Sequence, residues 1–392
     1  MTTAQPLCVL AVAAALAVAG CGRGHDSGNG GPTIGLKGSS SHAAQDLGFP
    51  TFATKNTTRV GGGDATADAA AIARAVYPAG ATGAHPDAVT LVDSKDWRVA
   101  VAASVLMAPP VRAPVLYAQG GSLPGATQDA LSSLHPTGST AAGGAQVIRV
   151  GSVPKPGKLR TTDVTGKAPF ELAGAIDRLA TAAKGSPAAA VVVASADAPD
   201  YGMPAAAWAA KSGDPVLFVT RNEVPAPTIA ALQRHDKPNI YVLGPRSAVG
   251  GHAVGIMRRY GTVLRIGGND PVTSAIAFAR FQDGSFGWGV TDPGHGLVFA
   301  NASQPLVAAA AAPLSASGTY GPLLLVGPKG DLPPALVQFL LDIQPGYQSD
   351  PAHDAVYNHG WLVGDAQQVS PATQSRIDAL LEVSRVTAPR SP

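Results

Sequence analysis

The sequence predicts an α/β protein made of three tandem Rossmann-like or flavodoxin-like modules with parallel sheets. Two observations support this fold class. Four sequence blocks recur three times in the same order, as in proteins built from internal repeats. The strands in these blocks are short continuous apolar runs separated by helical segments, a pattern typical of parallel strands covered on both faces. We expect right-handed crossovers between the strands.

The first block is a glycine turn between a strand and an alanine-rich helix. It reads RVGGGD at 59–64 and RIGGND at 265–270, whereas DVTGKA at 163–168 replaces the arginine by aspartate and the aspartate by alanine. Arg59 with Asp64, and Arg265 with Asp270, have two possible roles. Each arginine could contact an anionic ligand, because a guanidinium presents a fork of donors. Alternatively, each pair locks the turn while the aspartate caps the following helix.

The other three blocks follow in a fixed order. A strand ending in a polar turn and a helix comes first, and a strand beginning at proline comes second. A strand ending at glycine comes last. The strand with the polar turn and helix lies at 87–107, 188–210 and 296–314 in the three copies. The strand that begins at proline starts at Pro114, Pro215 and Pro322, and the strand that ends at glycine lies at 146–151, 239–244 and 360–365. The final two copies continue into helices at 248–260 and 368–381. In this alignment Asp96, Asp200 and Gln304 are equivalent, and we expect the two aspartates to cap helices or stabilise turns.

This order of motifs resembles the cell wall binding repeat 2 family. The resemblance rests on R-[IV]-x-G-x-D before a helix containing A-x-x-[IF]-A, on the proline-initiated strand and on the strand that ends at glycine. It implies three α/β modules around a pseudo-threefold axis, here 53–157, 158–262 and 263–392. It also implies noncovalent binding of anionic cell wall polymers. The family usually carries Arg-Tyr-Glu-Thr after the turn aspartate, and this chain departs from that pattern.

A second candidate for polymer binding is the most basic local region of the third copy. Arg258 and Arg259 precede Arg265 closely, and Arg246 is near them in the sequence. These arginines form either a patch that faces the polymer or a solvated charged face.

The beginning of the chain predicts export and lipidation. An apolar run at 7–19 leads into VAGC at 18–21, and it is shorter than the roughly 20 residues that span a bilayer. Small residues before Cys21 resemble the lipobox of bacterial lipoproteins. We therefore predict a signal peptide at 1–20, a lipidated Cys21, and a flexible Gly/Ser-rich linker up to residue 52. An ordinary secretory signal, or an incorrectly assigned start, is the alternative. A lipidated Cys21 leaves no free thiol, which excludes disulfides and zinc–cysteine sites.

Composition and missing motifs narrow the function. The net charge of +2 gives no general field for nucleic acid. Neither G-x-G-x-x-G nor a Walker A motif occurs, the nine histidines are scattered, and no G-x-S-x-G motif is present. We therefore expect no cofactor, no metal site and no enzymatic activity. The sequence favours an extracytoplasmic, lipid-anchored envelope protein that binds an anionic cell wall glycopolymer. Two alternatives remain: a solute-binding lipoprotein of a transporter, and an extracytoplasmic α/β enzyme that acts on envelope polymers.

Overall fold

The structure is a computed structural model that describes residues 52–78, 85–318 and 321–386. All of them belong to one compact unit. The predicted signal peptide, Cys21 and nearly all of the predicted linker lie outside these residues. None of the described helices is long and apolar enough to span a membrane.

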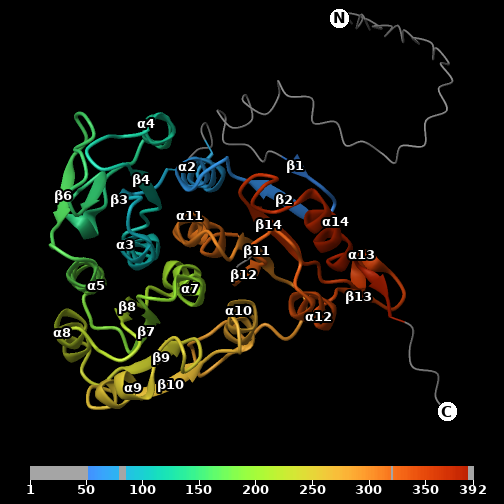
Figure 1. The fold of residues 1–392 in the computed structure, drawn as a ribbon. Coiled ribbons are helices and arrows are strands. Elements are labelled where there is room, and N and C mark those ends of the chain that lie inside the picture. The colour runs from blue at the N-terminus through green and yellow to red at the C-terminus, as the bar shows by residue number, and fades with distance from the viewer. Residues whose placement is uncertain (1–51, 79–84, 319–320, 387–392) are drawn as a thin grey trace, which may run out of the picture. The chain divides into compact units, whose positions relative to one another are not determined.

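Most of the described strands form three larger sheets whose strands run parallel except at one edge, and the predicted α/β class is confirmed (Figure 1). The first sheet has the order β4-β3-β5-β6, and its strands are β3 (Val89–Asp93), β4 (Val115–Ala118), β5 (Val147–Val150) and β6 (Thr161–Val164). The second has the order β10-β9-β7-β8, with β7 (Ala190–Ser195), β8 (Val216–Val219), β9 (Asn239–Leu243) and β10 (Thr262–Ile266).

The third sheet joins strands from the two ends of the described chain. Its order is β1-β2-β14-β11-β12, with β1 (Phe52–Ala53), β2 (Thr57–Val60), β11 (Gly296–Asn301), β12 (Leu323–Val326) and β14 (His359–Val363). β2 pairs in parallel with β14, and β1 adds an antiparallel edge (Figure 1). Two short strands, β13 (Gly346–Tyr347) and β15 (Ser384–Arg385), pair separately.

Helices follow the strands as the repeat predicts. The longer ones are α2 (Ala65–Val76), α3 (Trp97–Ala103), α4 (Gly125–Leu134), α5 (Pro169–Lys184), α7 (Pro204–Ser212), α8 (Ala226–Arg234), α9 (Gly251–Met257), α10 (Pro271–Arg280), α11 (Pro305–Ser315), α12 (Pro334–Asp342) and α14 (Pro371–Leu380). The short ones are η1 (Ser104–Met107), η2 (Thr140–Ala142), α6 (Pro199–Gly202) and α13 (Pro351–Asp354).

Four strands are buried along their whole length: the edge strands β4, β8 and β12 and the inner strand β11. This burial is expected for apolar runs covered on both faces. Helix α11 is apolar on all sides and is buried from Val307 to Ser315, which identifies a core helix. It packs against α2, α3 and α7, and its alanines allow these helices to approach closely.

The sheets divide the chain differently from the predicted module boundaries. The strand before each glycine turn completes one sheet, and the helix after it packs on the next. Thus β6 belongs to the first sheet and β10 to the second, while α5 contacts β8 and α10 contacts β12. A repeating sequence can be divided into equal units starting from any position in the repeat. Only the pairing of the strands shows where each sheet begins. The module boundaries and the pseudo-threefold axis stay predictions.

Candidate functional site

The turn aspartates cap helices, as one of the two interpretations predicted. Asp64 accepts hydrogen bonds from the backbone N–H groups of Thr66 and Ala67, at 2.8 and 2.9 Å. Asp270 forms a capping box with Thr273: its carboxylate accepts the Thr273 N–H at 2.9 Å, and its own N–H donates to the Thr273 hydroxyl at 3.1 Å. Both carboxylates therefore satisfy donors at the start of α2 and α10.

Arg59 secures a neighbouring loop, and its hydrogen bonds do not go to Asp64. Its guanidinium donates to the carbonyl oxygens of Gly364, Asp365 and Val369 at 2.7 to 3.0 Å, and to Gln374 Oε1 at 3.0 Å. The residue is only 6% exposed. Burial lowers the pKa of Arg59, and the nearby Asp365 partly offsets this effect. The arginine thus fixes the segment between β14 and α14.

Arg265 likewise secures a loop in the second sheet, and it keeps N–H donors that these contacts do not use. Its guanidinium donates to the carbonyl oxygens of Gly244 and Val249 at 2.7 and 2.6 Å. These two residues follow β9 as Gly364 and Val369 follow β14. Unlike Arg59, Arg265 is only half-buried, so part of its guanidinium still faces outward.

Beside Arg265 lies a pocket of about 340 Å³ that is rich in arginine. Its lining residues are Arg246, Gly251, Val254, Arg258, Val263 and Arg265. Arg246 and Arg258 are exposed, and no carboxylate lines the pocket. Burial, together with the charge of Arg246, lowers the pKa of Arg265. The pocket is therefore a concentration of positive charge with free donors, which we call the arginine pocket.

The structure brings together some of the predicted site residues and separates others. Arg258 and Arg265 meet in the arginine pocket, and Arg246 joins them. Arg259 is exposed just after α9 but does not line this pocket. Arg59, Asp64 and Asp270 lie outside it.

The corresponding place in the third sheet has different side chains. Alignment on Gly244 and Gly364 replaces Arg246 by Ala366 and Arg258 by Asp378. Gln374, in place of Val254, accepts the Arg59 Nε–H and donates to the Thr57 hydroxyl at 3.1 Å. The side chains that remain there bond to one another. The arginine combination of the second sheet is thus absent from the third.

The first sheet inverts the arrangement. Asp163 on β6 stands where Arg265 stands on β10, and the guanidinium comes from Arg149 on the neighbouring strand β5. Arg149 Nη1 lies 2.9 Å from Asp163 Oδ1, and the same side chain donates to the Val153 carbonyl. With Asp163 in place of the arginine, Arg149 still holds the loop through the Val153 carbonyl. The result is an ion pair instead of a cationic pocket.

Asp68 is a buried carboxyl group that the sequence analysis missed. Its Oδ1 accepts the Gly62 N–H at 2.7 Å, and Ser274 makes the equivalent contact with Gly268 at 2.9 Å. Burial raises the pKa of Asp68 well above its ordinary value, although the Gly62 hydrogen bond opposes the shift. The available signal was a lone aspartate inside an alanine-rich helix. Its role is to support the turn.

The predicted equivalence of Asp96, Asp200 and Gln304 is wrong by two residues in the middle copy. Asp96 caps α3 and accepts the Arg98 N–H at 3.0 Å, which confirms its predicted role. Gln304 and Ala198 precede α11 and α6 at the same place, whereas Asp200 lies inside the first turn of α6. Because these segments are all rich in alanine, aligning them without gaps gives a similar match when one copy is displaced by two residues. No group of acidic, histidine or cysteine side chains suited to a metal occurs among the described residues.

Comparison with known proteins supports a cell-wall-binding class. Residues 172–254 match the family Cell wall binding domain 2 (CWB2), so the predicted resemblance is confirmed for this segment. The segment contains Arg246, Gly251 and Val254 of the arginine pocket. No curated protein matches this chain.

Two solved structures share the fold. Cwp6 from Clostridium difficile is 16% identical, with a TM-score of 0.64 over 83% of this chain and 48% of its own. Cwp8 from Clostridium difficile is 17% identical, with a TM-score of 0.62 over 84% of this chain and 52% of its own. The chain thus spans about half the length of these proteins. At this identity the likeness concerns the fold.

Proposed function

We propose that this chain is a lipid-anchored envelope protein that binds an anionic cell wall polymer through the arginine pocket. The observation that carries the proposal is the convergence of Arg246, Arg258 and Arg265 on one pocket without a lining carboxylate. The match of residues 172–254 to a cell wall binding domain supports the same conclusion.

The pocket combines one guanidinium held by hydrogen bonds with two exposed ones. Arg265 is held by the Gly244 and Val249 carbonyls, so its orientation costs no further entropy on binding. Arg246 and Arg258 are exposed and can close on a phosphate or carboxylate from the solvent side. Charge-assisted hydrogen bonds of this kind are roughly twice as strong as neutral ones. A bound anion would also relieve the repulsion between Arg246 and Arg265.

The lining chemistry favours binding over catalysis. Apart from the arginines, only one glycine and two valines line the pocket, so it offers no nucleophile or general base. Binding in the second sheet alone would be weak. A lipid on Cys21 would hold the protein beside the wall, and the higher effective concentration would compensate.

Co-sedimentation with cell walls tests the proposal. Walls are used intact, and after chemical removal of their anionic polymers, with wild type, Arg246→Ala, Arg258→Ala and the double variant. We expect binding to intact walls that falls with salt and disappears on stripped walls. The double variant is expected to bind about tenfold more weakly, or about 1.4 kcal/mol. Arg178→Ala is the matched control, because it removes the same charge from an exposed position on α5 outside the pocket.

Three results would contradict the proposal: equal binding to stripped walls, equal losses for the control and the double variant, or no binding at all. Saturable binding of one small solute would favour the transporter alternative, and polymer cleavage would favour the enzyme alternative.

A further inference from the structure

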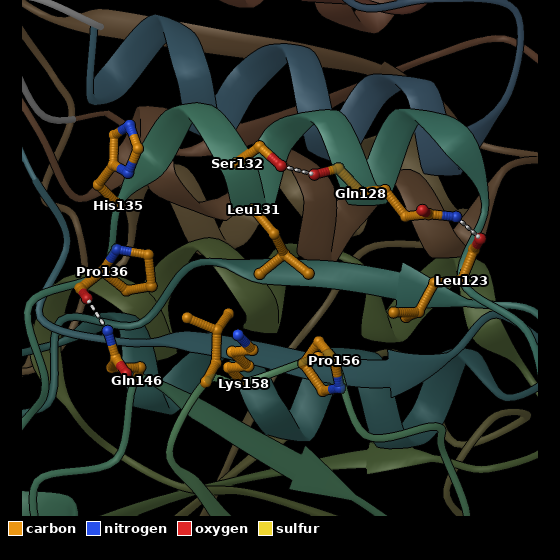
Figure 2. Close-up of a pocket in the computed structure, with 11 residues that line it drawn as sticks. Leu123, Gln128, Leu131, Ser132, His135, Pro136, Gln146, Pro156 and Lys158 are labelled. Atoms are coloured by element: carbon orange, nitrogen blue, oxygen red, sulfur yellow. Dashed lines mark hydrogen bonds between the residues drawn. The ribbon is translucent and has the colours of Figure 1, made fainter.

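The first sheet has a groove that the proposed function does not use. It lies between α4 and the segment before β6 and encloses about 540 Å³ (Figure 2). Leu123 and Leu131 come from the α4 side, and Pro156 and Leu159 from the opposite side. We call this feature the α4 groove.

Three polar side chains of the α4 groove, those of Gln128, Ser132 and Gln146, are already hydrogen-bonded to the protein. Gln128 donates to the Leu123 carbonyl at 2.7 Å, and Ser132 donates to the Gln128 carbonyl at 2.9 Å (Figure 2). Gln146 donates to the Pro136 carbonyl at 2.8 Å (Figure 2). These bonds leave few donors for a sugar or a polar solute. What the groove presents is apolar surface.

The other two sheets show what belongs at this place. Thr127 of α4 and Thr228 of α8 each donate to the second strand of their sheet, at Tyr117 and Phe218, so the two helices can be aligned. Leu131 then corresponds to Leu232 of α8, and the prolines before α4 and α12 place Leu340 at the same position.

Leu232 and Leu340 each belong to a hydrophobic cluster that includes residues of a further helix. Leu232 shares a hydrophobic cluster with Ala253 and Met257 of α9. Leu340 shares one with Ile377 and Leu381, in and next to α14. Both leucines are fully buried, whereas Leu131 is 7% exposed and lines the groove.

The first sheet has no helix at that position. Residues 151–160 connect β5 to β6 without a helix, although the matching connections hold α9 and α14. None of the helices that the structure describes is spare to fill the place. Both α9 and α14 are packed on their own sheets. The leader sequence at 7–19 is apolar throughout, and the sequence at 22–52 is rich in Gly and Ser, so neither is amphipathic.

We infer that the α4 groove is the docking site for an amphipathic helix of a partner protein. The partner helix takes the place that α9 and α14 take on their sheets, with apolar residues at i, i+4 and i+7 against Leu131 and Leu159. Lys158 is the only lining side chain with a full charge. The flank of the partner helix beside it is therefore acidic.

A peptide copied from this chain is the probe. A fluorescein-labelled peptide of residues 368–383, which contains α14, is titrated with the full chain and followed by fluorescence anisotropy. Because isolated short helices are marginal in water, we expect weak binding, with a dissociation constant of about 100 µM. The assay detects dissociation constants up to about 1 mM. A scrambled peptide should not bind. The same peptide with Arg376→Glu should bind more tightly, and Lys158→Glu in the chain should remove that advantage.

The blocking variant is Ser132→Arg, which places a long side chain in the groove from an exposed position and leaves the core intact. We expect it to weaken peptide binding at least tenfold. Ser375→Arg, an exposed position on α14, is the matched control and should bind as wild type does. Absence of binding below about 1 mM, equal binding of the scrambled peptide, or equal binding by Ser132→Arg would each overturn the inference.

Discussion

Replacement of Arg59 by alanine separates a structural arginine from a ligand-binding one. The wild-type guanidinium makes three hydrogen bonds to the segment between β14 and α14 and a fourth to Gln374 of α14. The substitution leaves three backbone carbonyls and the Gln374 amide oxygen without this donor. A buried acceptor without a partner costs about 1–3 kcal/mol, and water that enters the vacated space offsets part of this cost. We therefore expect a loss of about 3–5 kcal/mol in the free energy of unfolding.

Arg265→Ala is the matched comparison. Arg265 makes two such bonds and is half-buried, so we expect a loss of about 1–2 kcal/mol. Urea unfolding followed by circular dichroism measures both values, provided that the denaturant slopes agree with wild type. Wall co-sedimentation of each folded variant completes the comparison, and Arg59→Ala should keep wild-type binding. A smaller stability loss for Arg59→Ala than for Arg265→Ala would refute the reasoning. So would a loss of wall binding by Arg59→Ala that is larger than the loss caused by Arg246→Ala.

Three further predictions concern the turn between β2 and α2 and its counterpart before α10. Because burial raises the pKa of Asp68, its folded form holds a proton that the unfolded chain has released above about pH 4. Stability therefore declines as the pH rises toward the folded pKa. Asp68→Asn should stabilise the protein more at pH 8 than at pH 5 in urea unfolding, and equal effects would contradict the assignment. Gly61→Ala should cost about 3 kcal/mol or more, because φ is +133° and the new Cβ would lie 2.4 Å from the Asp68 carboxylate. Gly63→Ala, whose Cβ would meet nothing closer than 3.8 Å, should be nearly neutral in the same urea unfolding assay. Asp270→Ala should lower stability by about 1 kcal/mol through loss of the helix cap and leave wall binding unchanged, whereas a large loss of binding would assign the carboxylate to the ligand.

The sequence by itself determined the local structure of this protein. Strand positions, helix positions and the caps at Asp64, Asp96 and Asp270 followed from apolar runs, glycine turns and side chains that satisfy free N–H groups. These features depend on neighbours within a few residues, which the sequence displays directly. The arginine-rich region around Arg258 and Arg265 was visible for the same reason.

Tertiary structure decided which strands pair and which arginines remain free. The two turn arginines, Arg59 and Arg265, occupy equivalent sequence positions, yet one is buried in a loop and the other borders a pocket. Their surroundings differ: Gln374, far away in the chain, accepts a hydrogen bond from the first, whereas Arg246 and Arg258, which are nearer in the sequence, line the pocket beside the second. The position of β2 in the last sheet and the missing helix over α4 are likewise results of long-range pairing and packing, which a repeat pattern does not encode.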